Sequence, residues 1–180
     1  MFMNAMYTYL GVDKVPTSLI NSIQMEIADG DDDEYKLAEY ADEVVKLKEN
    51  AWEMPPVKRG DYFDDLFGNN LGHNFPVVDK LENRVLTSIK SMDLSLKTYQ
   101  KPNGIFGKIL KDASTLKSFT GKDWGKTRIT ASLFDNDKKV LQIILPNMSI
   151  SAQQMLELQA AEVYIENEYK IQLLLTVATK

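Results

Sequence analysis

Residues 74–90, NFPVVDKLENRVLTSIK, contain two short apolar runs on either side of a turn-like LEN segment. Asp79 follows the first run, and Ser88 and Lys90 end the second. Side chains two positions apart point to the same face of a strand, so Ser88 and Lys90 are expected to share a face. Asp79 and Lys90 are eleven positions apart, which suits a hairpin that brings a carboxylate and an amine together. We expect this hairpin to carry the chemistry and the rest of the chain to support it.

The composition limits both the class of protein and the kind of metal site. The chain has 180 residues, of which 44% are hydrophobic and 26% charged, ordinary values for a soluble globular domain. No apolar run approaches the roughly 20 residues of a membrane helix, so no stable membrane insertion is expected. The absence of cysteine excludes disulfides, thiolate metal sites and cysteine nucleophiles. The single histidine, His73, excludes a histidine-rich zinc site and is interpreted as a loop residue, so a metal would need oxygen ligands.

Charge divides the chain at residues 55–60, PPVKRG. Residues 1–57 carry 12 acidic and 4 basic residues, whereas residues 58–180 carry 14 acidic and 17 basic ones. A mildly basic body after an acidic leader is compatible with nucleic-acid binding. We therefore predict an acidic helical leader over residues 1–57 and a functional domain over residues 58–180.

Hydrophobic periodicity and turn residues predict a mixed α/β (α+β) fold. The expected elements are a leader of two helices (19–28 and 35–52), a short helix (61–67), the hairpin strands (75–78 and 84–89), a helix (105–119), an antiparallel strand pair (128–134 and 140–145), a helix from Ser149 or Ser151 to residue 168, and a buried strand (171–177). Elements in this order predict a mixed central sheet flanked by helices, preceded by an N-terminal helical hairpin.

The polar residues of the hairpin are those that phosphodiester hydrolysis requires. A divalent cation held by carboxylates activates water and offsets the developing charge. A nearby lysine orients the water or stabilises the transition state. Asp79, Ser88 and Lys90, together with one acid from the helix over residues 61–67, supply these groups.

The same residues resemble the PD-(D/E)XK, or restriction-endonuclease-like, superfamily, in which an acidic helix precedes a hairpin bearing D…(D/E)-x-K. Here Ser88 replaces the carboxylate that usually stands two positions before the lysine. The longer pattern is similar to the nuclease toxins of contact-dependent growth inhibition, a branch in which serine occupies that position. The matching segments are Lys58-Arg59-Gly60 with Asp64, residues 70–79 (NLGHNFPVVD), and residues 87–94 (TSIKSMDL).

The resemblance implies a role for each matching residue. Asp64 and Asp79 would bind a divalent metal (Mg²⁺, Mn²⁺ or Zn²⁺), with Ser88 as a supporting ligand and Lys90 as the catalytic amine. Asp61 or Asp65 is an alternative to Asp64, because family helices usually carry glutamate there. The residues expected to contact nucleic acid are Lys97, Thr98, Tyr99, Lys108 and Lys111.

The resemblance also implies a biological setting. It predicts a metal-dependent nuclease toxin, delivered as part of a larger secreted or cell-surface protein, that acts in the cytoplasm of a target bacterium and is neutralised by a cognate immunity protein. DNA is the first expectation for the substrate and tRNA the second. The alternatives are a non-catalytic acidic binding protein, such as an immunity protein, and a degenerate member of the fold that binds nucleic acid without cutting it.

Overall fold

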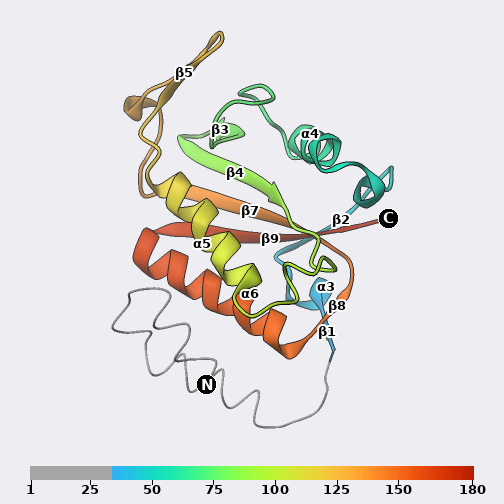
Figure 1. Cartoon of the computed structure of the whole chain (residues 1–180). Helices are drawn as coiled ribbons and strands as arrows, with labels where there is room; N and C mark the ends of the chain where they lie inside the picture. Colours follow the sequence, from blue (N-terminus) through green and yellow to red (C-terminus); the bar gives the residue numbers. More distant parts are fainter. Residues whose placement is uncertain (1–33) are drawn as a thin grey trace.

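The structure, a computed structural model, describes residues 34–180 (Figure 1). The helix expected over residues 19–28 lies outside the described residues. The strands are β1 (Tyr35–Lys36), β2 (Glu43–Lys46), β3 (Lys80–Glu82), β4 (Val85–Ser91), β5 (Lys122–Trp124), β6 (Thr127–Ile129), β7 (Lys139–Pro146), β8 (Ser149–Ile150) and β9 (Ile171–Thr179). The helices are α3 (Leu37–Tyr40), α4 (Pro56–Leu66), α5 (Gly104–Lys117) and α6 (Ala152–Tyr164), with short helical turns η1 (Ala51–Glu53), η2 (Ala131–Leu133) and η3 (Ile165–Tyr169).

A five-stranded mixed sheet forms the centre of the described residues, in the order β2-β9-β7-β4-β3. Neighbouring strands are parallel except for β3, which pairs antiparallel with β4 at the edge. Helices α5 and α6 lie side by side on one face, and α4 lies on the other side of the molecule from α6 (Figure 1). The expected mixed central sheet flanked by helices is confirmed.

Strand β7 is buried on both faces of the sheet. Leu141, Ile143 and Leu145 join the larger core with residues of α5 and α6. Ile144 joins a smaller core with Phe63 of α4. A strand enclosed by parallel neighbours and covered on both faces is mostly apolar, and the buried Gln142 of β7 donates a hydrogen bond to the Thr176 hydroxyl (3.0 Å). Its sequence therefore lacks the alternation of a half-exposed strand.

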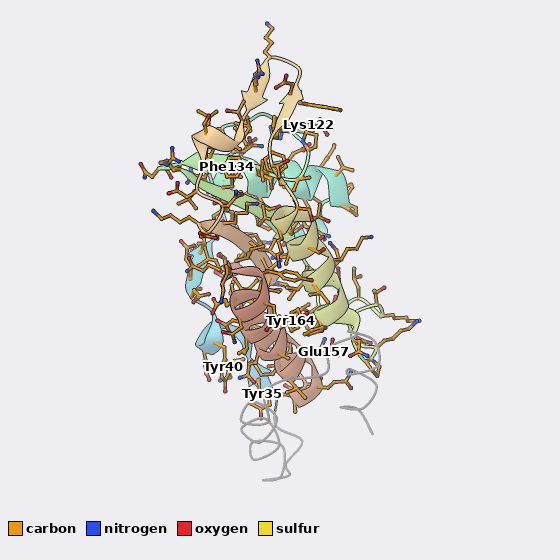
Figure 2. All side chains as sticks on the ribbon, turned by 90° about the vertical axis from the view of Figure 1, so that its left-hand side faces the viewer. Tyr35, Tyr40, Lys122, Phe134, Glu157 and Tyr164 are labelled. Carbon is orange, nitrogen blue, oxygen red and sulfur yellow. The ribbon has the colours of Figure 1, made fainter. Side chains whose placement is uncertain are left out.

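The expected antiparallel pairing of residues 128–134 with 140–145 is wrong. Strand β7 pairs in parallel with β4 and β9, whereas β6 pairs with β5 across the Gly125 turn. The β5–β6 hairpin projects from the body of the molecule, with Lys122 near its base (Figures 1 and 2). A continuous apolar run does not reveal strand direction, because both parallel and antiparallel partners can bury it.

The single helix expected over residues 35–52 is also wrong. From residue 34 to Ala41 the structure has one helix, α3, and β2 then lies parallel to β9 at the far edge of the sheet. Val44 and Val45 are β-branched and favour a strand. The Asp42 carboxylate accepts a hydrogen bond from the Leu175 N–H (2.7 Å), which fixes the start of β2 against β9. The division of the chain at residue 57 stays a prediction.

Helix α5 is the expected helix, and a buried charged side chain binds each of its ends. The Glu157 carboxylate accepts hydrogen bonds from the N–H groups of Asn103, Ile105 and Phe106 (2.9, 2.9 and 3.1 Å). Figure 2 shows Glu157 of α6 close to the first turn of α5. At the other end, Lys139 Nζ donates to three backbone carbonyls of residues 116–119. A carboxylate at the N-terminus and an ammonium at the C-terminus both complement the helix dipole.

The other expected elements are present. Helix α6 begins after Ser151, whose side chain and that of Gln154 form a capping box. Strand β9 covers the expected final strand. Across residues 34–180, no helix combines the length and the apolar character needed to cross a bilayer.

Glu157→Ala is expected to destabilise the fold by about 3 kcal/mol, because it leaves buried N–H groups without acceptors. Glu157→Gln keeps one acceptor oxygen and should lose about half as much. Urea unfolding followed by circular dichroism measures both. A Glu157→Ala variant within about 0.5 kcal/mol of the parent would show that the carboxylate is not needed to hold α5 on α6.

Candidate active site

The β3–β4 hairpin fixes Asp79 against β4. Its two-residue turn, Asn83-Arg84, has positive φ at both positions (50° and 67°), as the tightest hairpins require. The Asp79 N–H donates to the Thr87 carbonyl (2.9 Å). Asp79 Oδ2 accepts from the Ile89 N–H (2.6 Å), at the place where a longer β3 would have supplied a carbonyl. The carboxylate therefore continues the hydrogen bonding of the sheet edge.

The same carboxylate binds Lys90, as the spacing predicted. Lys90 Nζ lies 3.3 Å from Asp79 Oδ2. The Asp79 side chain is 12% exposed and that of Lys90 34% exposed, so the pair has one buried partner and one that reaches solvent. A charge pair at such a boundary is only partly screened by water. The ammonium is thus held in place yet stays accessible to a bound molecule.

The first strand of the hairpin differs from the prediction. Residues 75–78 form turns, and β3 begins at Lys80. Val77 has φ of 75°, a conformation that a β-branched side chain rarely adopts. The Ser88 hydroxyl, 2% exposed, donates to the Val77 carbonyl (2.7 Å). Ser88 therefore supports the strained turn that precedes Asp79, and only its oxygen lone pairs remain for another partner.

Asp64 of α4 lies close to this pair. The pKa of Asp64 is raised from 3.8 to about 6, first by burial and then by the charge of the Asp79 carboxylate, whereas Lys90 and His73 act to lower it. Two carboxylates that approach each other resist simultaneous ionisation, and a bound cation relieves that repulsion. The structure thus brings Asp64, Asp79 and Lys90 together.

His73 is a part of this region that the sequence did not predict. Asp61, Asp64 and His73 each offer a ligand atom, and these atoms lie within 4.8 Å of one another. His73 Nε2 is also 3.1 Å from Asp65 Oδ1, and Nδ1 is 3.5 Å from Asp61 Oδ1. The available signal was a lone histidine near an acidic helix. This pattern was insufficient for a prediction, because His73 reaches the acids of α4 through the turn at Gly68 to Asn70, and the path of that turn is not specified by the local sequence.

The residues expected to contact nucleic acid occupy two elements. Lys97 and Thr98 are exposed in the loop after β4, whereas Tyr99 is partly buried and its pKa is raised by that burial. Lys108 of α5 forms an ion pair with Asp112, and Lys111 is exposed. Their contact with a substrate stays a prediction.

Comparison with known proteins identifies the family. Residues 59–176 match the family described as CDI toxin restriction endonuclease-like domain. The chain belongs to this family. A solved structure, the CdiA-CT/CdiI toxin and immunity complex from Yersinia pseudotuberculosis, has the same fold: it is 22% identical with a TM-score of 0.54, over 69% of this chain and 98% of that chain. None of the proteins with curated descriptions matches the sequence significantly. The chain is a CDI toxin domain, and its restriction-endonuclease-like fold is confirmed.

Ser88→Ala in the toxin domain should lower the free energy of unfolding by about 1–2 kcal/mol, because it removes a buried hydrogen bond to the strained Val77 carbonyl. Ser91→Ala, on the same strand, has no such bond and should change stability by less than about 0.5 kcal/mol. Urea denaturation of both variants in EDTA separates this structural role from a metal-binding one. Equal stability of Ser88→Ala and the parent would contradict the structural role.

Asp64→Asn should stabilise the toxin domain at pH 7.5 but not at pH 4. The raised pKa means that the folded state binds the Asp64 proton more tightly than the unfolded chain does. The resulting stability is complete below the unfolded pKa and is lost as pH rises through about 6. Thermal melts in EDTA should show a gain of roughly 2–4 °C at pH 7.5. Asp137→Asn, an exposed control, should melt like the parent at both values, and a pH-independent effect of Asp64→Asn would contradict the mechanism.

Proposed function

We propose that this toxin domain is a metal-dependent endonuclease that hydrolyses phosphodiester bonds of DNA, with tRNA as the alternative substrate. The observation that carries the proposal is the meeting of Asp64, Asp79 and Lys90 in a chain of the CDI toxin restriction endonuclease-like family. Two carboxylates beside an amine are the groups that a metal-assisted phosphodiester hydrolysis needs.

The donor set fits a divalent cation of Mg²⁺, Mn²⁺ or Zn²⁺ type. Asp64 and Asp79 supply oxygen ligands, the Ser88 hydroxyl oxygen lies on the same strand as Lys90, and His73 adds a nitrogen donor near Asp64. The pKa of Asp64 is raised first by burial and then by the charge of Asp79, and a cation bound beside both carboxylates would lower it. When bound, such a cation supplies an activated water and offsets the negative charge of the substrate.

Lys90 is the side chain that would stabilise the negative charge developing during hydrolysis. Its ammonium is held by Asp79 on one side and reaches solvent on the other. There it would donate to a non-bridging phosphate oxygen or to the attacking water as negative charge develops. Asp79 orients the amine through their ion pair, so it would serve both as ligand and as positioning group.

The substrate is proposed from charge and exposure. Lys97 and Thr98 extend from the loop after the catalytic strand, and Tyr99 follows them; Lys108 and Lys111 line α5. Such groups contact the sugar–phosphate backbone in both DNA and RNA. The sequence carries no base-reading motif, so the choice between DNA and tRNA rests on the cleavage assay.

An immunity protein is the proposed physiological partner. The structural relative is a toxin and immunity complex, and the family is one of CDI toxins. We propose that the domain is delivered to a target bacterium as part of a larger secreted or cell-surface protein and acts in its cytoplasm. Membership in the toxin family speaks against the alternative that the chain is itself an immunity protein.

Lys90→Ala should reduce cleavage by at least about 100-fold, because it removes the donor that stabilises the transition state. The assay incubates the protein with supercoiled plasmid and, separately, with total tRNA, each with Mg²⁺, Mn²⁺, Zn²⁺ or EDTA. The nucleic acid that is cut in a metal-dependent way identifies the substrate.

Lys138→Ala is the matched control and should leave cleavage unchanged. Lys138 is exposed and lies just before the first residue of β7, whereas Lys90 lies near the end of the parallel neighbour β4. Cleavage that persists in EDTA or in Lys90→Ala would overturn the proposed mechanism. Binding without cleavage by the parent under every metal would favour the degenerate, nucleic-acid-binding alternative.

A further inference from the structure

The hairpin formed by β5 and β6 exposes a tryptophan between two lysines. Trp124 is 50% exposed, and Lys122 and Lys126 are exposed on either side of it. Arg128 of β6 forms an ion pair with Asp123 (3.2 Å), whereas neither lysine has an ionic partner among the described residues. Three cations and one acid give the hairpin a charge of +2, although the whole chain carries −5. A positively charged arm therefore projects from an acidic protein.

The base of this hairpin is fixed in the core. Phe119 before β5 and Ile129 at the end of β6 belong to the larger core, and the Phe119 ring lies 6.5 Å from the Phe75 ring. A Cβ at Gly121 would lie 2.6 Å from the Ile129 carbonyl oxygen, so this close entry into the hairpin requires glycine. Gly125, with φ of 58°, begins the two-residue turn at the tip. The hairpin is thus held at its base while its tip stays exposed.

Trp124 shares a face of the hairpin with the residue that contacts the loop before β3. It lies directly opposite Thr127 in the strand register, and residues directly opposite each other share a face. The Thr127 hydroxyl donates to the Leu71 carbonyl (3.3 Å). The preceding residue, Asn70, donates its N–H to the Asp79 carbonyl (3.3 Å). Two adjacent loop residues therefore bridge this face of the hairpin and the carboxylate residue that binds the proposed catalytic amine.

Cations beside an exposed indole match the chemistry of a nucleic-acid strand. Each phosphate that a lysine neutralises releases condensed counterions, and the face of an unpaired base stacks on an aromatic ring whatever the identity of the base. Figure 1 shows the hairpin at the β3 edge of the sheet, on the side away from α6. A strand bound at Asp79 would therefore have the hairpin beside it.

We propose that the β5–β6 hairpin binds the nucleic-acid substrate beside the cleavage site, with Trp124 stacked on an unpaired base and Lys122 and Lys126 against neighbouring phosphates. This inference rests on the proposed nuclease function and deepens it, because it requires an unpaired nucleotide near the bond that is cut. A tRNA loop supplies such a nucleotide directly, and DNA supplies it where the duplex opens. The hairpin is separate from the contacts proposed after β4 and on α5.

The first test measures binding of a fluorescein-labelled single strand of thymidines, and of a fully paired duplex, to the Lys90→Ala protein. Adding Trp124→Ala should weaken binding of the single strand about tenfold and that of the duplex less than twofold. Tyr40→Ala is the matched control, because this aromatic side chain is 48% exposed and lies at the opposite end of the molecule from Lys122 (Figure 2). Equal weakening of both ligands by Trp124→Ala, or no weakening, would overturn the stacking.

The second test measures the salt dependence of the same binding. Lys122→Met with Lys126→Met should lower the slope of log affinity against log salt by about 0.7 for each of two phosphate contacts on the single strand. Lys46→Met with Lys48→Met removes the same charge from exposed positions in and just after β2, at the other edge of the sheet, and should leave the slope nearly unchanged. An equal drop in slope for the two double variants would overturn the phosphate contacts in favour of diffuse charge.

The third test reads the stacking itself from tryptophan fluorescence. The chain has two tryptophans, and Trp52 packs on Phe63 of α4. Saturation with the unlabelled single strand should quench the emission of the Lys90→Ala protein, because a stacked base quenches an indole. Trp124→Phe, which leaves Trp52 as the emitter, should show no quenching. Quenching that persists in Trp124→Phe, or its absence in the parent, would overturn the stacking.

The outcomes separate this inference from the proposed function. Cleavage by the parent protein, with binding unchanged in Trp124→Ala and in the Lys122→Met/Lys126→Met variant, would remove the hairpin's role alone and leave its surface to a protein partner. Absence of both cleavage and nucleic-acid binding by the parent protein would remove the nuclease proposal and the hairpin's role together.

Discussion

The hydrogen bond from the Ile89 N–H to the Asp79 carboxylate is the interaction on which the candidate site depends. Strand β3 is too short to pair with the whole of β4, and this side chain replaces the missing backbone acceptor. The same oxygen holds Lys90, and the same charge contributes to the raised pKa of Asp64. One carboxylate thus completes a sheet edge, orients an amine and creates a local excess of negative charge.

Buried side chains hydrogen-bond the backbone of the elements that support this carboxylate. Glu157 and Lys139 bind the two ends of α5, and Gln154 anchors the loop that follows β4. The strained Val77 turn is tolerated because Ser88 holds its carbonyl. Strain and like charge collect at the proposed active site, while the buried sheet supplies the stability that offsets them.

The sequence predicted the Asp79–Lys90 pair from their separation across a hairpin, although the first strand of that hairpin is Lys80–Glu82 and not residues 75–78. It predicted α5 and α6 from their period and a serine cap. It could not predict that Val44 and Val45 join the far edge of the sheet, because the partner strand is more than a hundred residues away. The direction of β7 was hidden for a different reason: a continuous apolar run is compatible with parallel and with antiparallel partners. His73 was missed because its neighbours come from α4, across a loop whose path no local pattern specifies.

Calorimetric titration of the folded domain with Mn²⁺ measures whether Asp64 and Asp79 together form a cation site. We expect one site per chain in the parent and a loss of affinity of at least about tenfold in Asp64→Asn, a variant expected to fold at least as well. Equal Mn²⁺ affinity in the parent and in Asp64→Asn would show that Asp64 is not part of a cation site.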